Sequence, residues 1–495
     1  MELLLLILLV IFLGILIYII IKHRVTGITR KQFWMLWSVI MSPAFSLGAW
    51  VVLYGKDEQL PLVLIISTFV IFLFLYWFLL QWGQVKSQEK PKQPSGDVST
   101  DDQTESKTSE LKLRPITPNE EKQLRNCFPW GIYYLQNLDY RPQAILCRGK
   151  LRANPELAYN TIQSKVTEKF GDRFFVIFQE GAKDQPFFAL VPNPHSQTQN
   201  PDQQFSEKPG LALGLLAISF FVTTISGIDI AVVSWDKLQI DLSLLQKGLS
   251  YSLALVGILL LREGSHYLMT RYYQIRSTLP YFIPLPFFPG TLGGLIQKRS
   301  PIPNRQALFD IAIIGPAVGL IASISILAWG ISISEVVDLS EESRLLSIDN
   351  LNPRFSFLLA ILSKIALGTQ LGQETAINLH PIAVAGYVAL GLTTLNLMPI
   401  GQLDGGQIAH AVFGQRTAAG IGQITRILML ILAWKQPDFL IIAIVTIFMP
   451  VFDEPALNDV SQLNNWRDLG GLLALAMVVI ILLPLPATVA QWLNL

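Results

Sequence analysis

The stretch Tyr251–Tyr273, YSLALVGILLLREGSHYLMTRYY, decides the fold, because it is apolar enough to cross a membrane and yet carries a cluster of charges. Charged side chains are costly to insert into a bilayer, so we expect Arg262, Glu263 and His266 to have a function. Their spacing is that of H-E-x-x-H, in which two His one helical turn apart bind zinc and the Glu handles the protons of a water. Arg262 stands where that frame has its first His.

The composition is that of a polytopic membrane protein. Of the 495 residues, 51 % are hydrophobic and 15 % are charged, whereas soluble domains have roughly 25 % charged residues. The formal net charge of +1 gives no sign of nucleic-acid binding. Two cysteines, Cys127 and Cys147, cannot form a disulfide framework.

Apolar runs and polar stretches divide the chain into four parts. Residues 1–84 are expected to hold three spans, residues 85–113 a disordered polar linker, residues 114–205 a soluble α+β domain and residues 206–495 a membrane core. The three spans are predicted at Leu3–Ile21, Phe33–Tyr54 and Leu60–Trp82. In the soluble domain we predict a helix over Asn154–Phe170 and strands over Gln143–Cys147, Arg173–Gln179 and Pro186–Val191.

The membrane core should contain further spans and one irregular segment. Phe282–Leu295 is apolar but rich in Pro and Gly, so we expect a re-entrant hairpin enclosed by protein. The fold class is therefore mainly α, and we expect about eight spans among nine apolar segments in total. The apolar segments of the core are Leu211–Ile230, Leu249–Tyr273, Ala307–Ile333, Ile382–Met398, Leu428–Phe452 and Leu469–Leu493, the last two each interrupted by Pro.

Basic residues in short loops predict the orientation. The first span is followed by four basic residues, Lys22, Arg24, Arg30 and Lys31, so we expect its C-terminal end in the cytosol. Counting the spans onward places the soluble domain in the cytosol as well. The acidic loop Glu335–Asp349 then falls outside. No Arg- and Ser-rich leader precedes the first span, which argues against an organelle transit peptide.

A second motif, NLMPIGQLDGG at Asn396–Gly406, ends the span that begins near Ile382. Asp404 lies where the apolar helix becomes polar, and two glycines follow it, which allows close approach of backbone. Taken alone, the motif is also consistent with a helix end that has a solvated Asp and a Gly cap.

Together the motifs resemble the site-2 protease family of intramembrane zinc metalloproteases. The E-x-x-H of the first motif is followed after 141 positions by the Asp of N-x-x-P-x-x-x-L-D-G-G, and Gly315-Pro316-x-x-Gly319 lies between them. The chain is most similar to the cyanobacterial and plastid branch typified by the ethylene-dependent gravitropism-deficient and yellow-green proteins. Three further stretches carry this likeness: CRGKLR at Cys147–Arg152, LHPIAVAGY at Leu379–Tyr387 and PALNDV at Pro455–Val460.

The resemblance implies a Zn²⁺ cofactor, hydrolysis of peptide bonds within the membrane, and transmembrane proteins as substrates. It implies Glu263 as the catalytic base and His266 and Asp404 as metal ligands. It also implies a multi-pass protein in the plasma or thylakoid membrane of a bacterium, with a cyanobacterium suspected. Residues expected to support the site or bind substrate are Asn396, Pro399 and Gly405.

Arg262 departs from the family pattern. A guanidinium only donates hydrogen bonds and cannot bind a metal, so we expect weak or absent zinc binding. We predict instead a two-pronged ion pair between Arg262 and Asp404; the alternative is that Arg262 reaches toward a membrane interface. His380 and His410 are the possible replacement ligands, and neither is expected to restore the site.

These observations leave three functions open. The first is a non-catalytic relative that binds transmembrane substrates or partner proteases, and the second is an active zinc protease with atypical ligation. A transporter would also explain charges within the membrane, but no inverted repeat is visible. The Phe282–Leu295 hairpin could receive a substrate by strand addition, or it could only fill space between helices.

Overall fold

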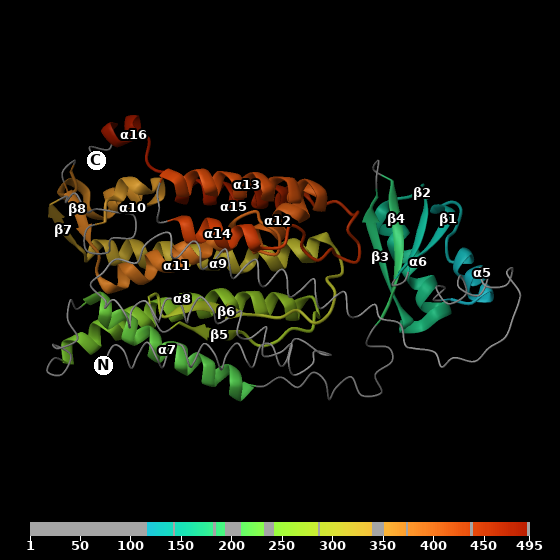
Figure 1. The fold of residues 1–495 in the computed structure, drawn as a ribbon, viewed down its shortest axis with the longest axis horizontal. Helices are drawn as coiled ribbons and strands as arrows, with labels where there is room; N and C mark the ends of the chain where they lie inside the picture. The colour runs from blue at the N-terminus through green and yellow to red at the C-terminus, as the bar shows by residue number, and fades with distance from the viewer. Residues whose placement is uncertain are drawn as a thin grey trace, which may run out of the picture. The chain divides into compact units, whose positions relative to one another are not determined.

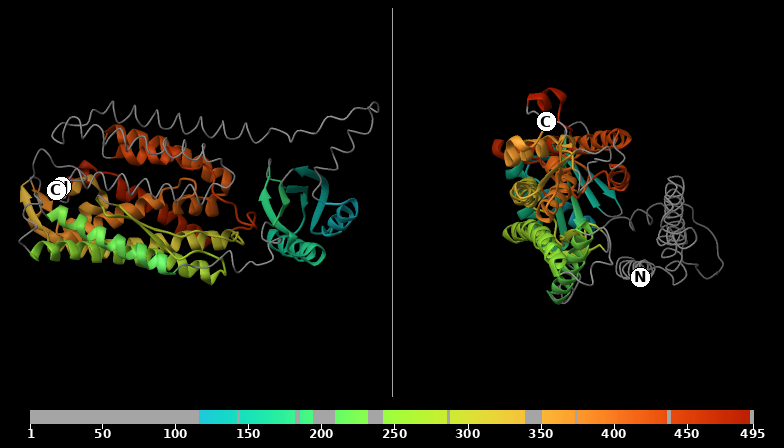
Figure 2. Two further views of the ribbon diagram at one scale, coloured as in Figure 1. Left: turned by 60° about the horizontal axis from the view of Figure 1, so that its bottom comes forward. Right: turned by 90° about the vertical axis from the view of Figure 1, so that its left-hand side faces the viewer.

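The computed structural model describes residues 116–141, 144–181, 185–193, 209–231, 242–285, 288–338, 351–372, 375–435 and 439–492. The three predicted N-terminal spans and the linker at 85–113 lie outside these residues. The described part is mainly helical and contains small antiparallel sheets (Figures 1 and 2). This agrees with the predicted mixture of a helical core and an α+β domain.

The domain predicted to be soluble, which keeps the name soluble domain below, is a four-stranded antiparallel sheet with two helices. Its strand order is β1-β2-β4-β3, so β1 and β3 form the edges. The predicted helix and all three predicted strands are confirmed, whereas α5 and β1 were not predicted. The elements are α5 (Pro118–Asn126), β1 (Tyr133–Arg141), β2 (Ala144–Leu151), α6 (Pro155–Phe170), β3 (Phe174–Glu180) and β4 (Pro186–Pro192).

Local sequence explains these elements. The Asn154 side chain accepts a hydrogen bond from Glu156 N and so caps α6, while Pro155 occupies the first turn, where no backbone donor is needed. Alternate residues of β3 are buried, as expected for a strand with one face on the core. Phe178 of β3 stacks on Phe188 of β4, with ring centroids 4.1 Å apart.

The second part of the chain forms the helical core. Within the described ranges, four of its helices are long and apolar enough to cross a membrane, namely α7, α9, α13 and α15. Its helices are α7 (Pro209–Ala231), α8 (Leu242–Tyr272), α9 (Arg305–Ser332), α10 (Phe357–Leu367), α11 (Pro381–Leu397), α12 (Asp404–Phe413), α13 (Gln415–Lys435), α14 (Leu440–Phe448), α15 (Asn465–Leu482) and α16 (Ala487–Trp492).

Helix α9 lies at the centre of this core. It packs against α8 and α11, which also contact each other, and against α12 (Figure 1). Small residues allow this close packing: a Cβ on Gly330 of α9 would lie 2.4 Å from the backbone of Ala383 on α11. The three helices that carry the sequence motifs therefore face one another.

Two segments differ from simple spans. Phe282–Leu295 falls in a hairpin of β5 (Tyr281–Pro284) and β6 (Thr291–Leu295), and its re-entrant course stays a prediction. The segment Leu428–Phe452, predicted to be apolar and interrupted by Pro, belongs to two helices, because α13 ends at Lys435 and α14 begins at Leu440. A second small sheet pairs β7 (Glu335–Asp338) with β8 (Thr375–Asn378).

Candidate functional site

The two sequence motifs meet where α8 faces the first residue of α12. Arg262 Nη2 donates a hydrogen bond to Asp404 Oδ2 at 3.4 Å. His266 Nε2 lies 3.8 Å from Asp404 Oδ1, and Arg262 Nη1 lies 3.8 Å from Glu263 Oε1. Residues 142 positions apart in the sequence thus form one cluster of four ionisable side chains.

The cluster is buried in the protein. Arg262, Glu263 and His266 are 4 %, 6 % and 7 % exposed, and the Asp404 side chain is 15 % exposed. This confirms the predicted contact between Arg262 and Asp404 and contradicts the alternative that Arg262 reaches toward an interface. The contact is not two-pronged, however. Only Nη2 bonds to the carboxylate, and the buried Arg262 Nε has no hydrogen-bond partner among the residues that the structure describes.

Glycines of α9 and β6 make room for these side chains. A Cβ on Gly315 would lie 2.5 Å from His266 Nδ1, and a Cβ on Gly319 would lie 3.2 Å from Arg262 Cδ. A Cβ on Gly294 of β6 would lie 3.0 Å from Glu263 Cγ. Because Gly315 and Gly319 have no side chains, they leave space for His266 and Arg262 of the first motif.

The glycines after Asp404 fix the start of α12. A Cβ on Gly405 would lie 1.8 Å from the Leu397 carbonyl oxygen, and one on Gly406 would lie 2.2 Å from the Gly401 carbonyl oxygen. Any side chain would push α12 away from the end of α11. The Asp-Gly-Gly sequence therefore holds Asp404 toward α8 through backbone packing.

Two other residues expected at the site lie beside it with structural partners. Asn396 Nδ2 donates to the Leu392 carbonyl in its own helix at 2.9 Å. The Pro399 carbonyl oxygen lies 3.0 Å from the position of a Cβ on Gly422 of α13. No contact between either residue and the four-residue cluster is seen among the described interactions. Their roles in binding a substrate stay predictions.

The two candidate replacement histidines have other partners. His380 accepts a hydrogen bond from Ile382 N and caps α11 at the end opposite Asp404. His410 is buried in α12, with Nδ1 at 2.6 Å from Asp453 and Nε2 at 2.9 Å from Asp459. Both ring nitrogens of His410 are therefore occupied away from the cluster.

The sequence did not point to Lys298, which follows β6. Its Nζ donates to Gln407 Oε1 on α12 at 2.9 Å, one helical turn after Asp404. A second cation thus lies near the Asp404 carboxylate. The sequence signal for Lys298 is limited to its place in a basic loop after the hairpin.

Comparison with known proteins agrees with this arrangement. Residues 250–433, which include most of α8 and all of α9, α11 and α12, match the sequence model of Peptidase family M50. Residues 122–199 match the EGY3 middle domain, so both parts of the described chain are covered. The chain belongs to peptidase family M50. Within this family of site-2 proteases it falls in the EGY-like branch.

Its M50 relatives include plant proteins. The probable zinc metalloprotease EGY1, chloroplastic, of Arabidopsis thaliana is 26 % identical over 69 % of this chain and 66 % of its own length. The EGY1 protein of Oryza sativa subsp. japonica is 25 % identical over 69 % and 63 %, and the EGY3 protein of Oryza sativa subsp. indica is 24 % identical over 73 % and 63 %. The chain thus spans slightly less than two thirds of their length. No solved structure matches.

M50 membership implies Zn²⁺, but the described side chains do not fit it. A catalytic zinc normally has three protein ligands and a water. His266 and Asp404 offer two, and the third side chain facing them is the Arg262 guanidinium, 3.4 Å from the carboxylate. Among the described residues, no group of three or more His, Cys, Asp or Glu side chains could hold a metal ion.

Proposed function

We propose that this M50 protein is zinc-deficient and acts as a non-catalytic binder or regulator of membrane proteins. The observation that carries this proposal is the contact between Arg262 Nη2 and Asp404 Oδ2. It engages the carboxylate expected to bind the metal. A fixed positive charge at this place also repels a dication, since an Arg side chain does not lose its proton in proteins.

The charge balance of the cluster supports the same conclusion. Buried charges are stable only when they are paired and hydrogen-bonded. Arg262 contacts Asp404 at 3.4 Å and Glu263 at 3.8 Å, so its guanidinium supplies positive charge to both carboxylates. Removing the guanidinium would leave these acids without their nearest positive charge.

Extended segments of membrane proteins are the ligands we expect at this site. Within the described sheets, β6 pairs only with β5, so its other edge has no strand partner. Gly294 of β6 lies against Glu263, and Leu292 and Leu295 are 52 % and 63 % exposed. An unwound transmembrane segment could add to this edge through backbone hydrogen bonds. Partner proteases are a second ligand class.

The alternative is an active zinc protease with atypical ligation. It is favoured by His266 and Asp404, whose Nε2 and Oδ1 atoms are 3.8 Å apart, with Glu263 buried beside them. In this case Glu263 would be the general base and Arg262 would have to leave the site. Two ligands from the protein make such a site weak.

Zinc analysis of the purified full-length protein tests the proposal. We compare the wild type with Arg262→His, which completes the three-ligand set, and with Arg262→Lys, which keeps the positive charge. We expect substoichiometric zinc in the wild type and in Arg262→Lys. Arg262→His should bind about one zinc per chain, because it supplies a ligand and removes the cation.

Stoichiometric zinc in the wild type that is lost in His266→Ala or Asp404→Asn would overturn the proposal and support the active protease. Cleavage of a transmembrane peptide by the wild type, absent in Glu263→Gln, would do the same. If the wild type lacks zinc and the Arg262→His variant binds it, the result supports the proposal that this one substitution removes zinc binding.

The location in the cell is part of the proposal. We propose a multi-pass protein of a bacterial plasma or thylakoid membrane, with the soluble domain in the cytosol. The four long apolar helices support membrane insertion, and the basic loops support the orientation. The curated relatives carry the word chloroplastic in their names, which is compatible with a thylakoid membrane.

A further inference from the structure

The segment between α14 and α15 joins the soluble domain to the helical core. Phe178 N on the edge strand β3 donates to Leu457 O at 2.6 Å, and Asp459 N donates to Phe178 O at 2.9 Å. On its other side, Leu457 N donates to Ile302 O at 2.8 Å and Asn458 N donates to Pro303 O at 3.0 Å. This segment, which we call the connecting strand (residues 457–459), therefore lies between β3 and the chain leading into α9.

Neighbouring side chains attach the connecting strand to two different cores. Leu457 and Val460 pack against the hydrophobic core of the soluble domain. Ala456 is fully buried in the core formed by the helices. The two cores thus meet within five consecutive residues, so a displacement of either part acts on the connecting strand.

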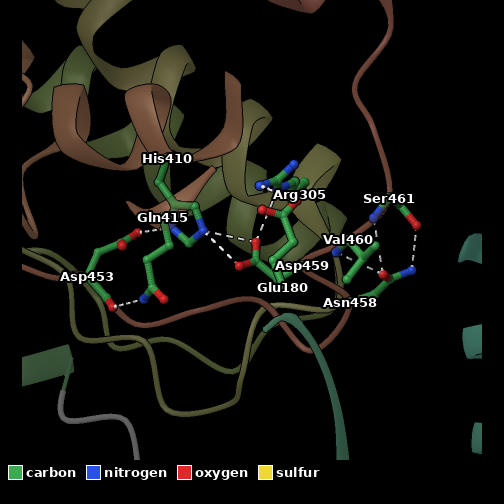
Figure 3. A network of polar contacts seen from close by, with 9 residues as sticks. All are labelled: Glu180, Arg305, His410, Gln415, Asp453, Asn458, Asp459, Val460 and Ser461. Carbon is green, nitrogen blue, oxygen red and sulfur yellow. Dashed lines mark hydrogen bonds and ion pairs between the residues drawn. The ribbon is translucent and has the colours of Figure 1, made fainter. Parts of the chain in front are cut away.

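Charged side chains, most of them buried, connect this junction to α12 (Figure 3). Glu180 at the end of β3 lies 3.6 Å from Arg305, which contacts Asp459 at 3.2 Å. Asp459 contacts His410 of α12 at 2.9 Å, and the other ring nitrogen of His410 contacts Asp453 at 2.6 Å. Arg305, Asp453, Asp459 and His410 are each less than 9 % exposed, so the contacts among these four residues are poorly screened by water. The Glu180 side chain is 48 % exposed, so its contact with Arg305 is screened more strongly.

Helix α12 connects this junction to the M50 site. It has ten residues, begins with Asp404, and holds His410 in its second turn. Its start is packed backbone to backbone on residues 397–401. A helix this short and this tightly packed moves as one body, so a shift of His410 also shifts Asp404.

We propose that the soluble domain sets the position of Asp404 through the connecting strand and the charges from Glu180 to His410. Asp459 and His410 are positioning residues in this arrangement. They bind no substrate, but they hold the helix whose first residue faces Arg262. The proposal goes beyond the proposed function, because it holds whether Asp404 faces a guanidinium or a metal ion.

Hydrogen–deuterium exchange of the full-length protein in lipid nanodiscs tests the proposal. The main variant is Glu180→Gln, which removes a charge of the soluble domain that reaches Arg305. Its matched control is Glu168→Gln, since Glu168 is an exposed acid of the same domain that pairs with Lys169. We expect α12 amides to exchange about threefold faster in Glu180→Gln and to be unchanged in Glu168→Gln.

A second pair of measurements extends the test. Asp459→Asn should speed α12 exchange by about tenfold, because it leaves Arg305 and His410 without their shared acid. Coupling is reciprocal, so Asp404→Asn should in turn speed exchange at 457–459 and in β3. If Asp459→Asn does not fold, Glu180→Gln and Asp404→Asn still give the test.

The proposal is overturned if Glu180→Gln changes exchange only in β3 and the connecting strand while α12 matches the control. It is also overturned if Asp404→Asn leaves 457–459 and β3 unchanged. Neither measurement involves a metal, so failure here is distinct from failure of the zinc-deficient site.

Discussion

At the residue scale, one substitution in a known frame changes the chemistry that the pocket can support. Arg262 lies on the face of α8 that carries His266, and its guanidinium reaches Asp404 on another helix. Glycines on α9 and β6 form the walls around it. The pocket therefore has glycines against its side chains while its interior holds an ion pair.

Gly315→Ala should lower the stability of the core. The new Cβ would lie 2.5 Å from His266 Nδ1, so α8 and α9 must separate, at a cost of about 1–3 kcal/mol in the free energy of unfolding. Gly264→Ala is the control, because nothing lies within 4 Å of its Cβ, and it should be neutral or stabilising. Equal effects in both variants would contradict the packing argument.

The Arg262–Asp404 pair should show strong energetic coupling. Asp404→Asn leaves a buried guanidinium without a full counter-charge and should destabilise the protein by about 2–4 kcal/mol. In a double-mutant cycle with Arg262→Gln, the combined loss should be smaller than the sum of the single losses by at least about 1 kcal/mol. Unfolding in mixed micelles gives the four free energies, and additivity within error would show that the contact carries no energy.

At the element scale, a network of charged side chains joins α12 to the segment after α14 and to the start of α9. Asp453 and Asp459 face its His410 from the segment after α14, and Arg305 at the start of α9 faces Asp459. Burial opposes the imidazolium, but the hydrogen bonds with Asp453 and Asp459 outweigh burial and raise the pKa of His410 to about 9. The charged His410 is thus part of the junction at neutral pH.

The contribution of His410 should disappear in alkali. Because its pKa is higher in the folded protein than the usual 6.5, the stabilisation is complete below that value and is lost as the pH rises through about 9. His410→Gln should therefore lower the melting temperature at pH 6–7 and have less effect near pH 10. A melting difference that does not depend on pH would contradict this assignment.

At the scale of the whole molecule, the soluble domain gains part of its core from the other end of the sequence. Leu457 packs on that core from the connecting strand. Cys127 and Cys147 lie within the same core, and burial raises the pKa of both thiols. Since the thiolate is the reactive form, both cysteines should react slowly with maleimides while the domain is folded.

Thiol labelling can therefore report on the junction. Leu457→Ala should destabilise the soluble domain by about 1–2 kcal/mol and speed labelling of the two cysteines at least about fivefold. Leu157→Ala on α6 is the control, because Leu157 is 55 % exposed and its loss should have little effect. Unchanged labelling in Leu457→Ala would show that the two parts are stable independently.

Sequence reasoning succeeded where the signal was local. The helix at Asn154–Phe170 has an N-cap and a first-turn Pro, and β3 and β4 have compact apolar runs. Strand β1 was missed because a bulge between Leu135 and Asn137 breaks its alternation of buried and exposed residues. The segment Leu428–Phe452 was expected to be interrupted by Pro, and it is divided between α13 and α14. Hydropathy alone does not show where one apolar helix ends and the next begins.

By itself, the sequence determined the motif-bearing helices, the hairpin and the family, because these depend on residue types at fixed spacing along one segment. It also predicted that Arg262 meets Asp404, since a buried cation requires an acid. Only the tertiary structure decided that the contact uses a single nitrogen, that His410 lies between Asp453 and Asp459, and that β3 pairs with residues 457–459. These contacts join segments far apart in the chain, and their geometry is set by how whole elements pack.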